Sequence, residues 1–148
     1  MSNRDPLSQP ATDVARAPLP RAARLLKPAD FKQVFKNNQA SNDSLFRIIA
    51  RANPNGRSRL GMAVSRKVDR SAVGRNRIKR VVRENFRNQL AGQILDSSLD
   101  FIVMPTNQAA RESNKVLDES LTVHWQQLIR KTEESNIGYP QDRLRTQR

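Results

Sequence analysis

The sequence contains no cysteine in its 148 residues, which excludes disulfide bonds, thiolate metal ligands and cysteine nucleophiles. It has no uninterrupted run of about 18 apolar residues, so no segment is expected to span a membrane. The first 24 residues also lack the apolar stretch of a secretory signal. We therefore expect a cytoplasmic protein whose core is monomeric and which needs no obligate protein partner.

Side chains suited to catalysis are also scarce. The single histidine, His124, shares an apolar helical stripe with Leu117, Leu121 and Leu128, which favours a structural role. The acidic residues show no metal-binding pattern such as D-x-D. We predict no catalytic residue and no metal site on this chain, so any chemistry must reside in a partner.

Positive charge is what the sequence has in excess. Its 27 Lys and Arg residues face 14 acidic residues, which gives a net charge of +13 and a pI near 11.4. Residues 57–87 hold eleven basic residues and two acids, so this stretch alone carries +9. Such an excess usually serves a polyanionic partner, either nucleic acid or an anionic membrane surface.

The apolar periodicity predicts an α+β domain of residues 25–131 between two disordered ends, 1–24 and 132–148. The first end contains four prolines, and the last contains Gly138 and Pro140. The predicted helices cover residues 27–36, 71–90 and 114–131, and the predicted strands cover 45–52, 60–68 and 99–104. The turn signal Asn53-Pro54-Asn55-Gly56 predicts that the first two of these strands pair as an antiparallel hairpin.

The helix that begins near Arg75 has two distinct faces. Its apolar side holds Ile78, Val81, Val82 and Phe86, and its polar arc holds Asn76, Lys79, Arg80, Arg83 and Arg87. Arginine outnumbers lysine in this arc, which favours bidentate contacts with RNA phosphates. A merely solvated face is the alternative, but the acids that would neutralise it are absent. Binding to lipid is less favoured, because the narrow apolar side is needed for the core.

Three segments together resemble the protein subunit of bacterial ribonuclease P. They are FKQVF at 31–35, LGMAVSRK at 60–67 and RNRIKR at 75–80, and the later DFIVMP (100–105) and LIRK (128–131) also fit. The resemblance covers residues 24–131. It implies a sheet of about four strands with three helices, in the order α-β-β-β-α-β-α, and a left-handed βαβ crossover.

The resemblance also implies a function and its residues. The family's subunit binds a catalytic RNA, which uses Mg²⁺, and assists this RNA in removing the 5′ leader from precursor tRNA. The expected contacts with the catalytic RNA are Arg75, Asn76, Arg77, Lys79, Arg80, Arg83 and Arg87. The expected leader-binding cleft comprises Phe31, Phe35, Arg47, Ile49, Arg51, Ser65, Arg66 and Lys67.

The residues themselves support the leader cleft only in part. Phe31 and Phe35, at helical spacing, fit a core position as well as a stacking platform for bases. Arg47 and Arg51 alternate with apolar residues and so place charge on one face of a strand. Ile49 stands where several family members have an aromatic residue, which weakens the case for stacking there. A ribosomal-type structural RNA-binding protein, with a basic helix but no leader cleft, is the alternative function, and a protein nuclease is a third.

Overall fold

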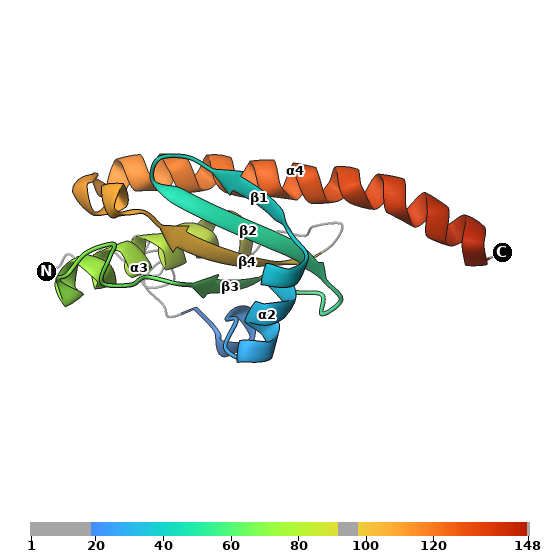
Figure 1. The fold of residues 1–148 in the computed structure, drawn as a ribbon, viewed down its shortest axis with the longest axis horizontal. Helices are drawn as coiled ribbons and strands as arrows, with labels where there is room; N and C mark the ends of the chain where they lie inside the picture. Colours follow the sequence, from blue (N-terminus) through green and yellow to red (C-terminus); the bar gives the residue numbers. More distant parts are fainter. Residues whose placement is uncertain (1–18, 92–97, 148) are drawn as a thin grey trace, which may run out of the picture.

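The computed structural model describes residues 19–91 and 98–147, in which the chain forms an α+β domain (Figure 1). A 3-10 turn, η1 (Arg21–Ala23), precedes helix α2 (Pro28–Lys36). Three strands follow: β1 (Gln39–Asn42), β2 (Phe46–Asn53) and β3 (Arg59–Met62). Next come α3 (Ala72–Phe86) and a π-helical turn, η2 (Arg87–Ala91). The last elements are β4 (Ser98–Pro105), η3 (Asn107–Arg111) and the long helix α4 (Asn114–Gln147).

The four strands form one mixed sheet in the order β1-β2-β4-β3. Strand β2 is antiparallel to both neighbours, and Ile48 lies opposite Ser41 of β1 and Val103 of β4. Strand β3 instead runs parallel to β4, with Leu60 opposite Phe101. The predicted hairpin of β2 and β3 is therefore wrong, because β4 lies between these two strands in the sheet. The second predicted strand also ends at Met62 and does not continue to residue 68.

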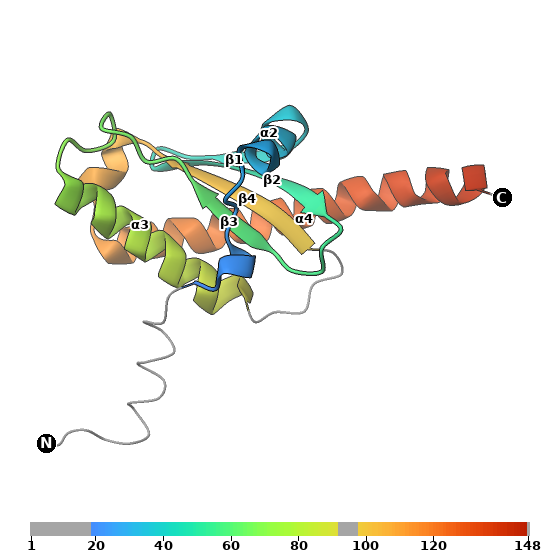
Figure 2. The same ribbon diagram turned by 90° about the horizontal axis from the view of Figure 1, so that it is seen from below.

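The sheet carries helices on both faces (Figure 2). Helices α3 and α4 cover one face, and α2 lies on the other. Alternate residues of β2 explain this arrangement: Phe46, Ile48 and Ala50 belong to the larger core, whereas Ile49 belongs to a smaller core beneath α2. The predicted alternation of this strand is confirmed: one side is apolar, and the other carries Arg47, Ile49 and Arg51, of which only Ile49 is buried.

The connection from β3 through α3 to β4 crosses over in the uncommon hand. Strands β3 and β4 point the same way in Figure 1, with β4 above β3, and Figure 2 places α3 on the face opposite α2. This geometry makes the crossover left-handed, against the general right-handed rule. The crossover thus places α3 on the same face of the sheet as α4, and the side of α3 turned away from the sheet stays uncovered by it.

The larger core is centred on aromatic residues from three elements. Trp125 of α4 is 1% exposed, and its ring lies 5.8 Å from that of Phe86 in α3 and 5.1 Å from that of Phe101 in β4. Both pairs are edge-to-face, the favoured geometry for aromatic rings. The Trp125 Nε1 donates to Asn85 Oδ1 at 2.6 Å, so the buried indole N–H is satisfied. These contacts fix α3 against α4 and so set the direction of its exposed face.

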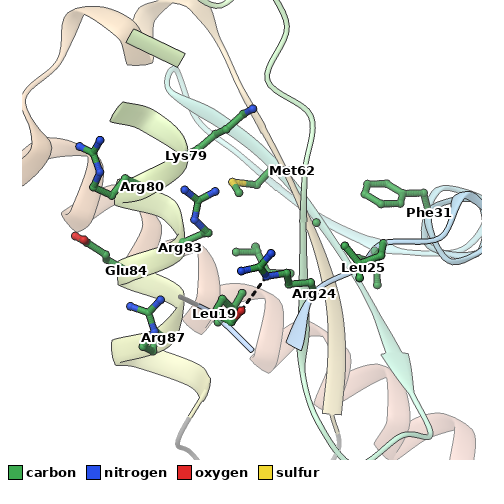
Figure 3. A pocket seen from close by; sticks show the side chains of 13 residues that line it. Leu19, Arg24, Leu25, Phe31, Met62, Lys79, Arg80, Arg83, Glu84 and Arg87 are labelled. Atoms are coloured by element: carbon green, nitrogen blue, oxygen red, sulfur yellow. Dashed lines mark hydrogen bonds between the residues drawn. The ribbon is translucent and has the colours of Figure 1, made fainter. Parts of the chain in front are cut away.

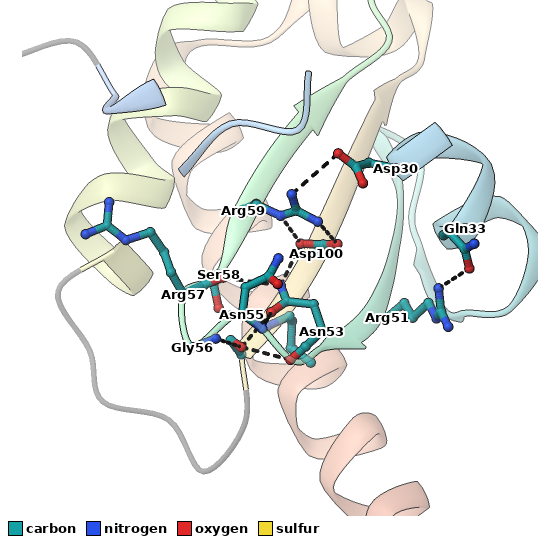
Figure 4. Close-up of polar contacts among 12 residues, drawn as sticks. Asp30, Gln33, Arg51, Asn53, Asn55, Gly56, Arg57, Ser58, Arg59 and Asp100 are labelled. Carbon is teal, nitrogen blue, oxygen red and sulfur yellow. Dashed lines mark hydrogen bonds and ion pairs between the residues drawn. The ribbon is translucent and has the colours of Figure 1, made fainter. Parts of the chain in front are cut away.

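Polar contacts tie α2 to the sheet on its other side (Figure 4). Arg59 of β3 donates from Nε and Nη2 to the two carboxylate oxygens of Asp100, at 2.8 and 2.7 Å. Its Nη1 lies 3.5 Å from Oδ2 of Asp30 in α2. On β2, the Arg51 Nη1 donates to Gln33 Oε1 of α2 at 2.6 Å. The short helix α2 is thus held at two points in addition to its small apolar core.

The buried histidine links β1, the following turn and α4. The His124 Nδ1 lies 2.7 Å from Ser41 Oγ, and its Nε2 lies 3.0 Å from Asp43 Oδ2. The Ser120 hydroxyl donates to the same carboxylate at 2.6 Å, and the backbone N–H groups of residues 45 and 46 donate to its other oxygen. Because His124 is 3% exposed and both of its ring nitrogens lie against these polar groups, it has the structural role that the sequence predicted.

Asp43 makes the stability of this fold sensitive to acid. Burial alone raises the pKa of its carboxyl, but the hydrogen bonds from Ser120 and the backbone and the charge of His124 lower the pKa below its usual value. The stabilisation is therefore present above the unfolded-state pKa and is lost as the pH falls through the lower folded-state pKa. We expect Asp43→Asn to reduce the free energy of unfolding at pH 6 but much less at pH 2.5.

Urea unfolding of both proteins at these two pH values measures the difference. Glu119→Gln is the matched control, since this exposed residue on α4 has the same type of charge but lies outside the network. An equal effect of Asp43→Asn at both pH values would contradict the assignment.

Both predicted ends of the domain need correction. Leu19, Ala23 and Leu25 are at most 4% exposed, so residues 19–24, predicted to be disordered, belong to the folded domain, and residues 1–18 of the predicted arm lie outside the described residues. Helix α4 does not stop near residue 131 but continues to Gln147. Thr132 is still buried, and the residues beyond it extend a helix that is already nucleated, although Pro140 has no N–H to donate. Gly138 and Pro140 therefore do not mark its end.

Candidate nucleic-acid interface

Helix α3 presents its basic residues along the face turned away from the core. The helix begins where Ser71 Oγ accepts a hydrogen bond from the Gly74 N–H at 3.1 Å, and its apolar stripe is buried against the sheet and α4. Arg80 is exposed, and Lys79 and Arg83 are half-buried. Among the residues that the structure describes, neither Arg80 nor Arg83 has a hydrogen-bonding or ion-pair partner. Their donors are thus available to a ligand.

The two arginines of the Arg-Asn-Arg motif differ from the rest of the basic face. The Arg75 Nη1 donates to the backbone carbonyls of Asp69 and Arg70, both at 2.9 Å. The Arg77 Nη1 donates to Asn114 Oδ1 at 2.6 Å, and its Nη2 donates to the carbonyls of residues 109 and 110. These side chains hold the loop before α3 and the segment before α4. Asn76 between them is exposed.

A groove of about 800 Å³ runs between α3 and the chain segment that precedes α2 (Figure 3). Its cationic residues come from both walls: Lys79, Arg80, Arg83 and Arg87 from α3, and Arg24 from the opposite segment. Its apolar residues are Leu19, Leu25, Leu26, Phe31, Leu60 and Met62, and Gly61 and Glu84 complete the lining. Five cations thus face one carboxylate around an apolar floor, an arrangement that suits a polyanion with apolar parts.

The charges in this groove repel one another. Burial lowers the pKa of Arg83, and the nearby positive charges of Arg24, Arg80 and Arg87 lower it further, against the opposing effect of Glu84. Arg83 stays protonated at neutral pH, because arginine titrates far above it. An anion in the groove would relieve this repulsion, so the electrostatics favour a negatively charged ligand.

Phe31 lies at the end of the groove nearest α2, and Gly61 is what allows it to do so. A Cβ placed on Gly61 would lie 2.8 Å from Cζ of Phe31, closer than real Cβ atoms approach, and a tight 3.1 Å from Cβ of Leu25. The ring therefore lies against bare backbone of β3. Phe35, one turn further along α2, is 51% exposed and does not line the groove. The two rings thus differ: Phe31 is partly core, and Phe35 is free to stack.

The remaining residues predicted for the leader cleft are not all brought together. Arg47 is exposed on β2, and Arg51 on the same face contacts Gln33 of α2. Ile49 is 1% exposed in the small core beneath α2, so it was wrongly predicted to line a cleft. The alternation of the strand placed it correctly on this face, but α2 covers it.

A second basic bay, of about 950 Å³, lies beside the start of α3. The predicted cleft residues Arg66 and Lys67 line this bay together with Val68, Asp69, Arg70, Asn107, Ala110 and Arg111. They do not line the groove that Phe31 lines, and Ser65 beside them is exposed. The reason is that β3 ends at Met62, so the chain turns away from the sheet before it reaches these residues.

The side of α3 that faces α4 has the opposite charge. A bay of about 550 Å³ there is lined by Glu84, Asp118 and Glu119 together with Asn85, Asn88, Gln89, Thr122 and Val123. No lysine or arginine lines it. Within residues 19–91 and 98–147, no group of three or more histidine or acidic side chains is arranged to hold a metal ion. In the same part of the chain, no helix is long and apolar enough to span a membrane.

Sequence reasoning missed the wall of the groove opposite α3. Leu19 and Arg24 fell in the segment predicted to be disordered, and Met62 was assigned only to a strand. One signal was present: Leu19, Ala23 and Leu25 form an apolar pattern that begins beside Pro20, the last proline of this segment. The fold and the groove together define an RNA-binding α+β domain, with a basic helix held on the open side of a left-handed crossover.

Comparison with known proteins identifies the family to which this RNA-binding domain belongs. The family model described as Ribonuclease P matches residues 19–129, so the chain belongs to the ribonuclease P protein family. The ribonuclease P protein component of Methylococcus capsulatus is 43% identical over 112 residues, which are 76% of this chain and 85% of that protein. That of Aliivibrio fischeri is 41% identical over 110 residues, which are 74% and 92% of the two chains.

Solved structures give the same result. The RNase P protein of Staphylococcus aureus superposes with a TM-score of 0.63 at 30% identity, covering 72% of this chain and 94% of that one. That of Thermotoga maritima gives a TM-score of 0.60 at 31% identity, covering 72% and 96%. This chain is thus a protein subunit of ribonuclease P, an RNA-binding protein of tRNA processing, and the ribosomal-type alternative is not favoured.

Proposed function

We propose that this chain binds the catalytic RNA of ribonuclease P in the cytoplasm and assists it in removing the 5′ leader from precursor tRNA. The observation that carries the proposal is the groove beside α3, where cations from two walls face a single carboxylate. The catalytic groups belong to the RNA, and Mg²⁺ is bound mainly there.

The contacts divide between two surfaces. The outer face of α3, with Lys79, Arg80 and Arg83, binds phosphates of the catalytic RNA together with Asn76 and Arg87. Arg75 and Arg77 act chiefly by holding the loops at each side of this face, since their guanidinium groups already donate to backbone carbonyls. The leader binds on the α2 side, where Phe31 and Phe35 offer rings to its bases. Arg47 and Arg51 add charge there.

Reconstitution of the cleavage tests the proposed function. Precursor tRNA is incubated at low Mg²⁺ with the candidate catalytic RNA of the source organism, with this protein, and with both, and 5′-leader release is measured. We expect cleavage only when both are present, because the protein's cations reduce the repulsion between two polyanions. The RNA alone at high Mg²⁺ is the control for an active RNA.

Two outcomes would overturn this proposal. Cleavage by the protein without RNA would show that it has an active site of its own. If the RNA is active by itself at high Mg²⁺ but the protein does not stimulate leader release at any Mg²⁺ concentration, the protein would instead be a structural RNA-binding protein.

A further inference from the structure

The segment that forms the second wall of the groove is built into the sheet. The Leu25 N–H donates to the Leu60 carbonyl at 2.9 Å, and Arg24 forms a parallel bridge with Leu60 at the free edge of β3. Leu19 and Ala23 are each 2% exposed and belong to the larger core. Arg24 therefore projects from a fixed backbone position.

The side chain of Arg24 is also held in one direction. Its Nε donates to the Leu19 carbonyl at 2.8 Å, which orients the guanidinium group across the groove toward α3. Arg83 lines the same groove from the opposite wall, and Glu84 is turned away from both arginines (Figure 3). Within the described residues neither arginine has a carboxylate at hydrogen-bonding distance. Two guanidinium groups that line a shared space from opposite walls, one of them held in place, are suited to one anion between them.

The floor between the two arginines indicates which anion fits. Leu25, Leu60 and Met62 lie there, and Phe31 closes one end. A free phosphate would leave this apolar surface unused. In a duplex the faces of the bases are stacked and hidden, whereas an unpaired nucleotide presents a base that can lie on apolar and aromatic side chains. The combination of charged rim and apolar floor therefore favours a single RNA strand.

We propose that Arg24 and Arg83 bind the phosphodiester backbone of an unpaired RNA strand from opposite sides of the groove, with a base on the floor at Met62 and Phe31. This inference rests on the proposed function and adds to it a binding residue outside helix α3. The strand belongs either to the catalytic RNA or to the leader. Both offer phosphodiesters and unpaired bases. The groove lies between α3, which is predicted to contact the catalytic RNA, and Phe31, which is predicted to contact the leader.

Binding of a fluorescent single-stranded RNA oligomer to the full chain, measured at several salt concentrations, tests this site. We expect Arg24→Gln to weaken binding roughly tenfold, as for the loss of one charge-assisted contact. We also expect the slope of log K against log salt to become shallower by about 0.7, as for one phosphate of a single strand. Binding of an RNA duplex should change much less.

Two variants serve as controls. Arg21→Gln removes the same charge from the same segment, but Arg21 does not line the groove, so we expect little change. Leu117→Ala destabilises the fold at a buried residue of α4 that does not line the groove, so it should lower the melting temperature without changing the salt slope. If Arg21→Gln matches Arg24→Gln, or if Arg24→Gln leaves the slope unchanged, Arg24 does not bind a phosphate and the proposal fails.

The source of the strand is found by comparing the reconstituted enzyme on precursor tRNAs with and without a leader. A leader-dependent loss of affinity with Arg24→Gln assigns the strand to the leader, and a loss of affinity for the catalytic RNA alone assigns it to that RNA. Either loss supports the site, and no loss in either measurement refutes it. If Arg24→Gln binds and cleaves as the unchanged chain does, only this inference fails. If the unchanged chain does not assist cleavage, the proposed function fails.

Discussion

Replacing both Arg80 and Arg83 with glutamine is expected to lower the affinity for the catalytic RNA by about a hundredfold. Each guanidinium has free donors on the outer face of α3, and a hydrogen bond between charged groups contributes about 1.5 kcal/mol or more. Two such contacts amount to about 3 kcal/mol, or two powers of ten in the dissociation constant. Titration of the labelled RNA at several salt concentrations measures the effect, and the salt slope should become shallower by roughly 1.4 to 1.8.

The matched control for this double variant lies on α4. Lys115 and Arg130 are also exposed and also cationic, but they belong to a different helix and line neither of the two basic cavities. Replacing both by glutamine changes the net charge of +13 by the same amount. If this control weakens binding as strongly as the α3 variant, the RNA responds to overall charge and not to the basic face.

Replacing Phe31 and Phe35 with alanine is expected to weaken binding of precursor tRNA by the reconstituted enzyme, and only when the substrate carries a leader. Stacking of a base on an aromatic side chain contributes about 1–3 kcal/mol, so loss of both rings, about 2–6 kcal/mol, predicts a change of about thirtyfold or more. Phe35→Ala alone should have little effect on unfolding, because the ring is 51% exposed. Phe31→Ala should also destabilise the fold, since its ring packs against Gly61.

Val123→Ala is the control for the exposed ring, because Val123 is also 51% exposed but lies on α4. Equilibrium binding of substrates with and without a leader separates the two effects. A loss of the same size for both substrates would mean that the rings only stabilise the fold. No loss for either would remove the leader cleft from the proposed function.

The local patterns of the sequence predicted the elements well, and their partners less well. The period of α3 placed Ile78, Val82 and Phe86 in the core because helical geometry is set by neighbouring residues. The pairing of β3 depended instead on β4, which follows it by about 40 residues. A turn signal such as Asn53–Gly56 shows that the chain reverses. It does not show which strand lies on the other side.

The residues of the site likewise fall into two groups: those that the local helical pattern predicts, and those whose position depends on contacts between distant segments. The helical wheel identified the charges of α3 that face outward, including Arg80 and Arg83. The family resemblance added Arg75 and Arg77, whose hydrogen-bond partners lie in loops that only the folded chain brings near. Arg24 was missed because its position depends on the edge of β3 and on the buried side chain of Leu19, neither of which is visible in a proline-rich segment.

The two sides of α3 have a consequence for how the protein meets its partner. One side carries the groove with five cations, and the side toward α4 carries the acidic bay of Glu84, Asp118 and Glu119. A molecule charged in this way experiences a torque in the field of a polyanion, which turns the groove forward before contact. Fewer collisions are then lost to wrong orientations, so charge placement raises the association rate as well as the affinity. Because salt screens this field over about 10 Å at 0.1 M, the advantage is greatest at low ionic strength.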